Sequence, residues 1–331
     1  MDVNELNGIA KRMVARGKGL LAADESTGTI KKRVDAIGVP NTAENRRDYR
    51  ELLFRTAPAL HDHIGGVILY DETIRQNAKD GTPLVKLIED AGAKPLAGCP
   101  GETITEGLDG LRERFAEYRA LGARFAKWRA VIDIGKEIPS YNAVNANAQA
   151  LARYAALAQE AGIVPIVEPE VLMDGDHDIA ACERVTTWVL KEVFQQLFYA
   201  GVVHEGMVLK PNMILPGMKC ARQNSVIEVA RATVRVLKDC VPASVAGIAF
   251  LSGGQSDEVA TAHLSAMNAM GALPWPLTFS YGRALQHAPQ KAWAGKPQNV
   301  AAAQKAFAHR ALMNSLATMG KWTEADEKRA A

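Results

Sequence analysis

Four apolar runs of this chain end in a charged or hydroxyl side chain, and the four ends recur at nearly equal intervals. The intervals are 41 or 42 positions, and the end residues are Lys127, Glu168, Lys210 and Ser252. Such a spacing suits one strand, one helix and their two loops. Burying an unpaired charge is costly, so packing alone does not put such groups at the ends of core strands. The pattern therefore predicts repeated strand–helix units whose strand ends carry the chemistry.

The same alternation extends over the whole chain. The apolar runs are residues 19–23, 64–70, 125–134, 163–168, 206–210, 247–251 and 276–280. The helical patterns between them are residues 44–60, 103–121, 145–161, 179–200, 223–239, 255–270 and 299–319. No linker rich in Gly, Ser or Pro divides the sequence. We therefore predict a single α/β domain, residues 1–331 with a short C-terminal tail, and favour a TIM (β/α)8 barrel over an open doubly wound sheet.

The charge balance argues against two classes of partner. The chain has 39 basic and 37 acidic side chains and a net charge of +2, which gives no global field for nucleic acid or a membrane surface. No apolar stretch approaches the roughly 20 residues of a membrane span, and the acidic start lacks the features of a signal peptide. The scattered Cys99, Cys182, Cys220 and Cys240 are expected to be free thiols. We expect a cytoplasmic protein with no nucleic-acid or membrane partner.

In a TIM barrel the carboxyl ends of the strands meet at one mouth, and the catalytic residues lie there. Several residues occupy this type of position, namely Asp24, Lys127, Glu168, Glu170, Lys210, Ser252 and Ser280. Any one of them alone would be explained as a strand-end residue that faces solvent. Because they coincide, we interpret them as one site.

Lys210 is the candidate nucleophile of this site. A lysine in a confined, partly apolar site can lose its proton, and a second cation nearby, here Lys127, favours that loss. The free amine attacks a ketone and forms an iminium, which is an electron sink for breaking the adjacent carbon–carbon bond. Glu168 or Glu170 is expected to shuttle protons in this step, and Asp24 to take a hydroxyl proton during cleavage.

Loops after the last two predicted strands have the features of a phosphate site. Ser252-Gly253-Gly254-Gln255 turns into a predicted helix, and exposed amides at a helix N-terminus favour an anion. Gly282 and Arg283 follow the next run and add a turn and a guanidinium. The segment with Ser26 and Thr29 either holds a second phosphate or caps the helix that follows. Two phosphate sites facing a lysine nucleophile indicate a sugar bisphosphate as the small-molecule partner.

Two clusters of potential metal ligands have simpler explanations. His61-Asp62-His63 precedes a predicted strand, so it lies at the wrong end of a barrel unit for catalysis. Residues 174–178, with His177, are typical of a solvated turn. We predict neither a metal nor another cofactor.

Six segments together resemble class I fructose-1,6-bisphosphate aldolase, the metal-independent Schiff-base enzyme. They are LLAADESTG (20–28), AKWR (126–129), PIVEPE (165–170), LKPN (209–212), LSGGQ (251–255) and TFSYGRAL (278–285). The likeness keeps this order from the N-terminal region to about residue 320. The resemblance implies reversible cleavage of fructose 1,6-bisphosphate to dihydroxyacetone phosphate and glyceraldehyde 3-phosphate, in a cytoplasmic homotetramer.

The resemblance also implies roles for individual residues. Lys210 would be the Schiff-base lysine, and Glu168 the acid and base of its formation. Lys127 would support charge and proton transfer, and Asp24 would handle the substrate hydroxyl. The surrounding charged network would comprise Glu170 and Arg129.

Substrate binding is implied at two places. The phosphate beside the ketone would be bound by Ser252, Gly253, Gly282 and Arg283. Ser280 would lie near the sugar. Ser26 and Thr29 would lie near the other phosphate.

Two departures from the family pattern matter. Relatives usually carry a strand reading Gly-Ile-Lys-Val-Asp before Pro95, so the third strand region of the barrel is expected to be shortened or deleted. Lys94 to Ala97 is a poor substitute, because proline suits a central strand badly. The family's terminal tyrosine also has no counterpart in residues 327–331.

The missing strand leads to the hypothesis of a native-like fold with impaired substrate binding. One alternative is a catalytically impaired homologue that acts as a binding or scaffold protein. The other is a different lysine-dependent sugar-phosphate aldolase, or a transaldolase.

Overall fold

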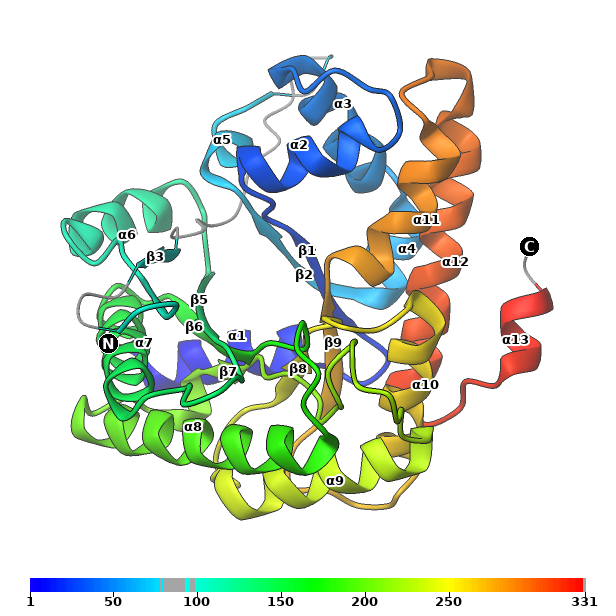
Figure 1. Cartoon of the computed structure of the whole chain (residues 1–331). Helices are drawn as coiled ribbons and strands as arrows, with labels where there is room; N and C mark the ends of the chain where they lie inside the picture. The colour runs from blue at the N-terminus through cyan, green and yellow to red at the C-terminus, as the bar shows by residue number, and fades with distance from the viewer. Residues whose placement is uncertain (78, 80–92, 96–98, 330–331) are drawn as a thin grey trace.

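The computed structural model describes residues 1–77, 79, 93–95 and 99–329, and its centre is a curled parallel sheet (Figure 1). The sheet has the order β2-β1-β9-β8-β7-β6-β5, and every neighbouring pair is parallel. Its strands are β1 (Gly19–Ala23), β2 (Ile64–Leu69), β5 (Phe125–Ile132), β6 (Val164–Val171), β7 (Val208–Leu209), β8 (Ile248–Phe250) and β9 (Leu277–Tyr281). Each strand coincides with one of the predicted apolar runs, and the predicted α/β barrel fold is confirmed.

Helices connect the strands and cover the outside of the sheet (Figure 1). Those in the first half are α1 (Val3–Met13), α2 (Thr27–Asp35), α3 (Ala43–Phe54), α4 (Ala57–His63), α5 (Asp71–Ile74), α6 (Leu111–Ala120) and α7 (Tyr141–Glu160). Those in the second half are α8 (Ile179–Tyr199), α9 (Val226–Cys240), α10 (Asp257–Asn268), α11 (Arg283–Trp293), α12 (Val300–Thr318) and α13 (Glu324–Arg329).

The strands are buried on both of their faces. All five residues of β1 and all eight of β6 are buried. A barrel strand needs apolar residues on both faces. Helices pack on its outer face, and side chains of the other strands pack against its inner face in the barrel interior. The charged side chains of β5 and β6 are therefore exceptions within an apolar core.

Polar caps set where several helices begin. Ser140, Ser225 and Ser256 each accept a hydrogen bond from a backbone N–H in the first turn of α7, α9 and α10. The Glu228 carboxylate accepts a hydrogen bond from the backbone N–H of Ser225, and this completes a capping box. Because each cap directly follows a strand-end loop, it also fixes where that loop ends.

Two predicted helices differ from the structure. The pattern at 44–60 is two helices, since a break at residues 55 and 56 separates α3 from α4, where Pro58 is the second residue. The predicted helix over 103–121 is wrong at its start, where β4 (Thr103–Thr105) lies, and only α6 is helical. Two β-branched threonines favour the strand, and Gly107 and Gly110, both at positive φ, separate it from α6.

The third strand region differs from a complete barrel. Lys94 and Pro95 belong to β3 (Ala93–Pro95), which pairs antiparallel with β4 in a separate two-stranded sheet. Within the described ranges, no strand bridges the β2 and β5 edges of the curled sheet. Leu96 and Ala97 lie outside the described residues. The segment before Pro95 thus supplies no barrel strand in the part that is described.

No helix in the described ranges is long and apolar enough to cross a membrane.

Candidate active site

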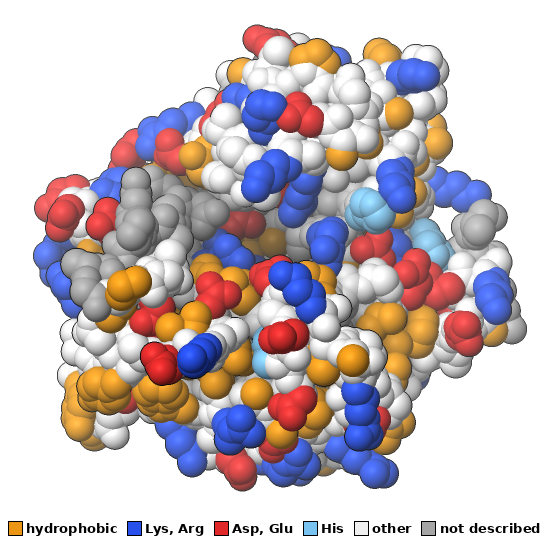
Figure 2. Space-filling view, viewed as in Figure 1, with side chains coloured by type: hydrophobic (Ala, Val, Ile, Leu, Met, Phe, Trp, Pro, Cys, Tyr) orange, Lys and Arg blue, Asp and Glu red, His pale blue; other side chains and the backbone are white. Residues whose placement is uncertain are grey.

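A cavity of about 310 Å³ opens where the carboxyl ends of the barrel strands meet. Of the residues predicted for the site, all except Ser26 line this cavity, and they come from both halves of the chain. The space-filling view shows a hollow near the centre of the molecule, with Lys and Arg side chains at its edge (Figure 2). The strand ends therefore gather the predicted residues into one site with both acidic and basic side chains.

Alternation along three neighbouring strands explains this gathering. Lys127 and Arg129 on β5, and Glu168 and Glu170 on β6, are two positions apart, so each pair points to the same face of its strand. Arg129 is the register partner of Glu168. The backbone N–H of Lys210 donates to the carbonyl of Val167 at 2.8 Å, which extends the β6–β7 ladder by one residue. In this register Arg129, Glu168 and Lys210 lie at one level, Lys127 lies two positions before it and Glu170 two positions after it, and all five side chains project to the same face.

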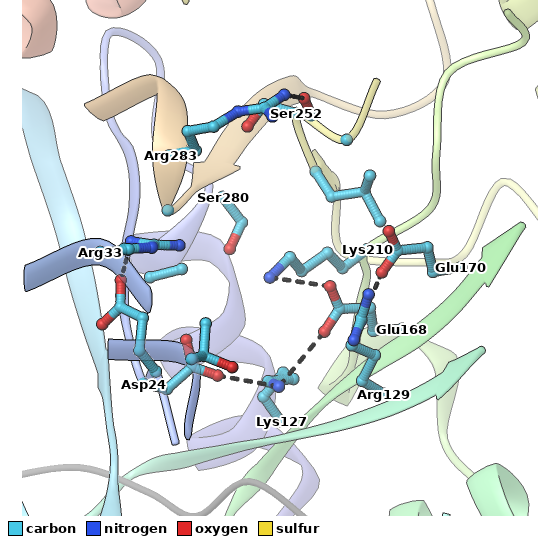
Figure 3. A pocket seen from close by; sticks show the side chains of 16 residues that line it. Asp24, Arg33, Lys127, Arg129, Glu168, Glu170, Lys210, Ser252, Ser280 and Arg283 are labelled. Atoms are coloured by element: carbon cyan, nitrogen blue, oxygen red, sulfur yellow. Dashed lines mark hydrogen bonds and ion pairs between the residues drawn. The ribbon is translucent and has the colours of Figure 1, made fainter. Parts of the chain in front are cut away.

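Lys210, Glu168, Lys127 and Asp24 form a continuous chain of buried charges (Figure 3). Lys210 Nζ lies 3.0 Å from Glu168 Oε1. Lys127 Nζ lies 3.6 Å from Glu168 Oε2 and 2.8 Å from Asp24 Oδ2. Two ammonium groups thus alternate with two carboxylates, which compensates most of the charge taken out of water.

The Asp24 carboxyl responds to its two cationic neighbours. Burial raises its pKa, but attraction to Lys127 and Lys210 and a hydrogen bond from Lys127 outweigh burial and bring the pKa to about 2. Asp24 is therefore ionised at neutral pH and accepts protons only when these contacts change.

Arg129 and Glu170 form an ion pair at the wall of the cavity (Figure 3). The Arg129 side chain is 41% exposed, whereas Glu170 is 10% exposed, so the guanidinium closes the solvent side of the pair. A Cβ at Gly253 would lie 3.2 Å from Glu170 Oε1, so glycine allows the next loop to approach this carboxylate. The Arg129–Glu170 pair thus lies next to the Ser252–Gly253 loop.

The Ser252 loop and the end of β9 face each other across the cavity. Arg283, the first residue of α11, donates from Nη2 to the carbonyl oxygens of Gln255 at 2.6 Å and of Ser252 at 3.4 Å. Ser280 Oγ is buried and has no hydrogen-bond partner among the described residues. Figure 3 shows this hydroxyl pointing into the cavity, towards Lys210. A free hydroxyl and a guanidinium held by carbonyls suit an anionic, oxygen-rich ligand.

The segment after β1 both caps a helix and contributes to the cavity. Ser26 is the N-cap of α2, and its Oγ accepts from the Thr29 N–H at 3.4 Å. Thr29 lines the cavity, and so does Arg33, which pairs with the buried Glu25. Arg33 was not among the predicted site residues. Its spacing of four from Thr29 was a usable signal, since residues four apart share a helix face.

The possible metal ligands do not assemble in the described part of the chain. No group of three or more His, Cys, Asp or Glu side chains gathers there in a geometry that could hold a metal ion. His61 and Asp62 pair with each other at 2.6 Å near the end of α4, ahead of β2. That position is at the amino ends of the strands, as predicted, and away from the cavity.

The fold and the site define an α/β barrel protein with a buried lysine–carboxylate cluster at its mouth. The family model for class I fructose-bisphosphate aldolase matches residues 5–331. The chain belongs to this family.

Curated relatives and a solved structure agree over nearly the whole chain. A probable class 1 fructose-bisphosphate aldolase of Xanthomonas campestris is 56% identical, over 97% of this chain and 99% of its own length. Aldolase C-A of Danio rerio is 50% identical, over 96% of this chain and 91% of its own. The Plasmodium falciparum aldolase, solved in complex with TRAP and a small-molecule inhibitor, is 46% identical with a TM-score of 0.95, over 97% of this chain and 96% of its own.

Proposed function

We propose that this chain cleaves fructose 1,6-bisphosphate reversibly to dihydroxyacetone phosphate and glyceraldehyde 3-phosphate through a Schiff base on Lys210. The observation that supports this best is the 3.0 Å contact between Lys210 Nζ and Glu168 Oε1 inside a buried site. A lysine that exchanges protons with one carboxylate can act first as nucleophile and then as the nitrogen of an iminium. The match to the class I fructose-bisphosphate aldolase family supports an aldolase reaction.

The proposed first stage is formation of the iminium. The amine of Lys210 attacks the ketone carbon, and the resulting carbinolamine loses water when Glu168 donates a proton to the leaving hydroxyl. Lys127 lies on the other oxygen of Glu168, at 3.6 Å, and compensates the carboxylate charge as this proton moves. The position of Glu168 between two lysines is what supports this role.

The proposed second stage is cleavage of the carbon–carbon bond. Asp24 accepts the proton of the substrate hydroxyl, the bond between the third and fourth carbons breaks, and its electron pair moves into the iminium to give an enamine. Glyceraldehyde 3-phosphate leaves first. Protonation of the enamine and hydrolysis then release dihydroxyacetone phosphate and restore the amine of Lys210. Because Asp24 is ionised at neutral pH, it is in the right state to accept this proton.

Two groups of residues are proposed to hold the phosphates. Ser252, Gly253, Gly282 and Arg283 would bind the phosphate beside the ketone, with Ser280 near the sugar. Thr29 and Arg33 on α2 would bind the other phosphate, and Ser26 would act there through its cap on the helix. Both groups line the same cavity, and this supports a bisphosphate rather than a monophosphate.

The interrupted barrel supports a further part of the proposal. No strand bridges β2 and β5 in the described residues, so the second phosphate has fewer protein partners in this part than a closed barrel would offer. We propose weaker binding of the bisphosphate with the chemistry intact. The chain would act as one aldolase domain, residues 1–331, in a cytoplasmic homotetramer that needs no metal.

A steady-state cleavage assay with fructose 1,6-bisphosphate and fructose 1-phosphate, with and without a chelator, tests this function. We expect cleavage of both substrates, a preference for the bisphosphate, and no effect of the chelator. Absence of cleavage would favour a binding or scaffold protein. Cleavage of fructose 1-phosphate with no cleavage of the bisphosphate would favour another lysine-dependent sugar-phosphate aldolase. Loss of activity with the chelator would exclude the metal-free mechanism.

A further inference from the structure

A buried histidine lies behind the loop that contains Ser252. His263 on α10 is 3% exposed, and its Nδ1 lies 2.7 Å from Oε1 of Gln255. Burial lowers the pKa of His263 to about 4, so the ring is neutral at pH 7. Because the partner atom is an amide oxygen, Nδ1 carries the proton and donates it.

This contact holds the Gln255 side chain. Gln255 is 7% exposed, and its Nε2 is buried without a hydrogen-bond partner among the described residues. The bond from His263 is therefore the anchor of the amide in this part of the structure. A buried amide with one good bond loses both its orientation and part of its hydrogen bonding when that bond is removed.

The main chain of the same glutamine holds Arg283. The carbonyl oxygen of Gln255 accepts from Arg283 Nη2 at 2.6 Å, the shorter of the two carbonyl contacts of this guanidinium. A guanidinium has five N–H donors in a rigid fork, so fixing one nitrogen sets the direction of the others. His263 and Arg283 thus contact the side chain and the main chain of one residue.

We propose that His263 is a positioning residue for the phosphate site: its hydrogen bond to Gln255 fixes the carbonyl that orients Arg283. His263 does not line the cavity, so it acts through Gln255 and not on the substrate. This inference rests on the proposed role of Arg283 in phosphate binding. His263, on the side of the loop away from the cavity, thereby contributes to the affinity for the phosphate beside the ketone.

Three substitutions in the full chain separate this role from general packing. His263→Leu removes the donor and keeps an apolar side chain in the buried position. His263→Asn keeps a donor, because Asn Nδ2 and His Nδ1 are both attached to Cγ. Gln255→Met removes the acceptor at similar volume, and it tests the same bond if His263→Leu does not fold.

The measurement is borohydride trapping of the iminium with dihydroxyacetone phosphate and with unphosphorylated dihydroxyacetone. We expect His263→Leu and Gln255→Met to need about tenfold more dihydroxyacetone phosphate for half-maximal trapping, as for one lost hydrogen bond. Trapping with dihydroxyacetone should change by less than about twofold, and His263→Asn should behave like the unchanged protein, since the bond is retained. A merely structural role would affect both ketones alike.

Arg283→Leu is the reference variant. It shows whether a negative result counts against the role of His263 or against the phosphate site itself. If Arg283→Leu weakens trapping of the phosphorylated ketone but His263→Leu and Gln255→Met do not, His263 has no positioning role and the proposed function stands. If Arg283→Leu also leaves the phosphorylated ketone unaffected, the proposed phosphate site is wrong, and the role of His263 falls with it.

Discussion

Lys210 and Glu168 meet at 3.0 Å between Nζ and Oε1, and both side chains are at most 5% exposed. They come from adjacent strands, β7 and β6, whose parallel ladder fixes their relative height. Because the backbone N–H of Lys210 still belongs to this ladder, the nucleophile starts from a rigid strand and not from a mobile loop. Pro211 follows at once and has no N–H to extend the ladder further.

Glu168→Gln should preserve the fold and remove most of the activity. The amide has the same shape but cannot exchange protons with Lys210, so we expect kcat for cleavage to fall by about 10²–10⁴-fold. KM should change much less, since Glu168 is not assigned to a phosphate. Steady-state kinetics and circular dichroism check this expectation. Glu170→Gln, two residues along the same strand, is the control and should retain more activity. Equal losses would argue against a special role for Glu168.

Asp24 should make the protein sensitive to acid at a predictable pH. Its pKa is 3.8 when unperturbed and about 2 in the folded chain. A lowered carboxyl pKa stabilises the folded state above pH 4, and this contribution, about 2 kcal/mol, is lost as the pH falls towards 2. Urea unfolding of the natural chain and Asp24→Asn at several pH values measures it. The pH dependence between 4 and 2 should be weaker in Asp24→Asn, and identical slopes would contradict the ion pairing.

Arg33→Ala should weaken binding of the substrate that carries a second phosphate. Loss of one charged hydrogen bond predicts a KM about tenfold higher for fructose 1,6-bisphosphate, with little change for fructose 1-phosphate. Lys31→Ala removes a charge from the same helix, but that side chain is 60% exposed and pairs with Asp35. It should leave both KM values unchanged. If Arg33→Ala and Lys31→Ala change the KM values alike, Arg33 acts through general electrostatic attraction and not through a specific contact with the second phosphate.

Gly254→Ala should destabilise the chain more than another glycine at positive φ. Gly254 has φ +74°, and an added Cβ would lie 2.5 Å from Met173 Cβ. Gly271 has φ +104° with nothing within 4 Å of an added Cβ. Gly271→Ala thus measures backbone strain alone, about 1–2 kcal/mol, and Gly254→Ala adds a steric clash. Denaturant unfolding of both variants compares them, and equal destabilisation would mean that Met173 moves away freely.

The sequence predicted the strands and the polar residues at their ends well, because both depend on local patterns. A parallel strand buried on two faces is a short apolar run, and an ionisable residue at its end stands out, as with Lys210 after Val208 and Leu209. The position of such a residue at the barrel mouth then follows from the parallel topology alone.

The sequence did not predict features that depend on how a helix packs against the loop before it. The spacing of four from Thr29 places Arg33 on the same helix face, but nothing near Arg33 shows that Glu25 pairs with it. The bond between His263 and Gln255 joins residues eight positions apart, and it requires the loop before α10 to pack against the first turns of that helix. The strand β4 was taken for helix, because its three residues are too few to show a period of two.

The proposed mechanism requires a covalent intermediate on Lys210. Borohydride reduction in the presence of dihydroxyacetone phosphate, followed by proteolysis and mass mapping, tests it most directly. We predict one stable adduct, on the peptide that contains Lys210, and none in Lys210→Met, with Lys127 unmodified in both. An adduct on Lys127 or elsewhere, or no adduct in a protein that still cleaves fructose 1,6-bisphosphate, would contradict the account.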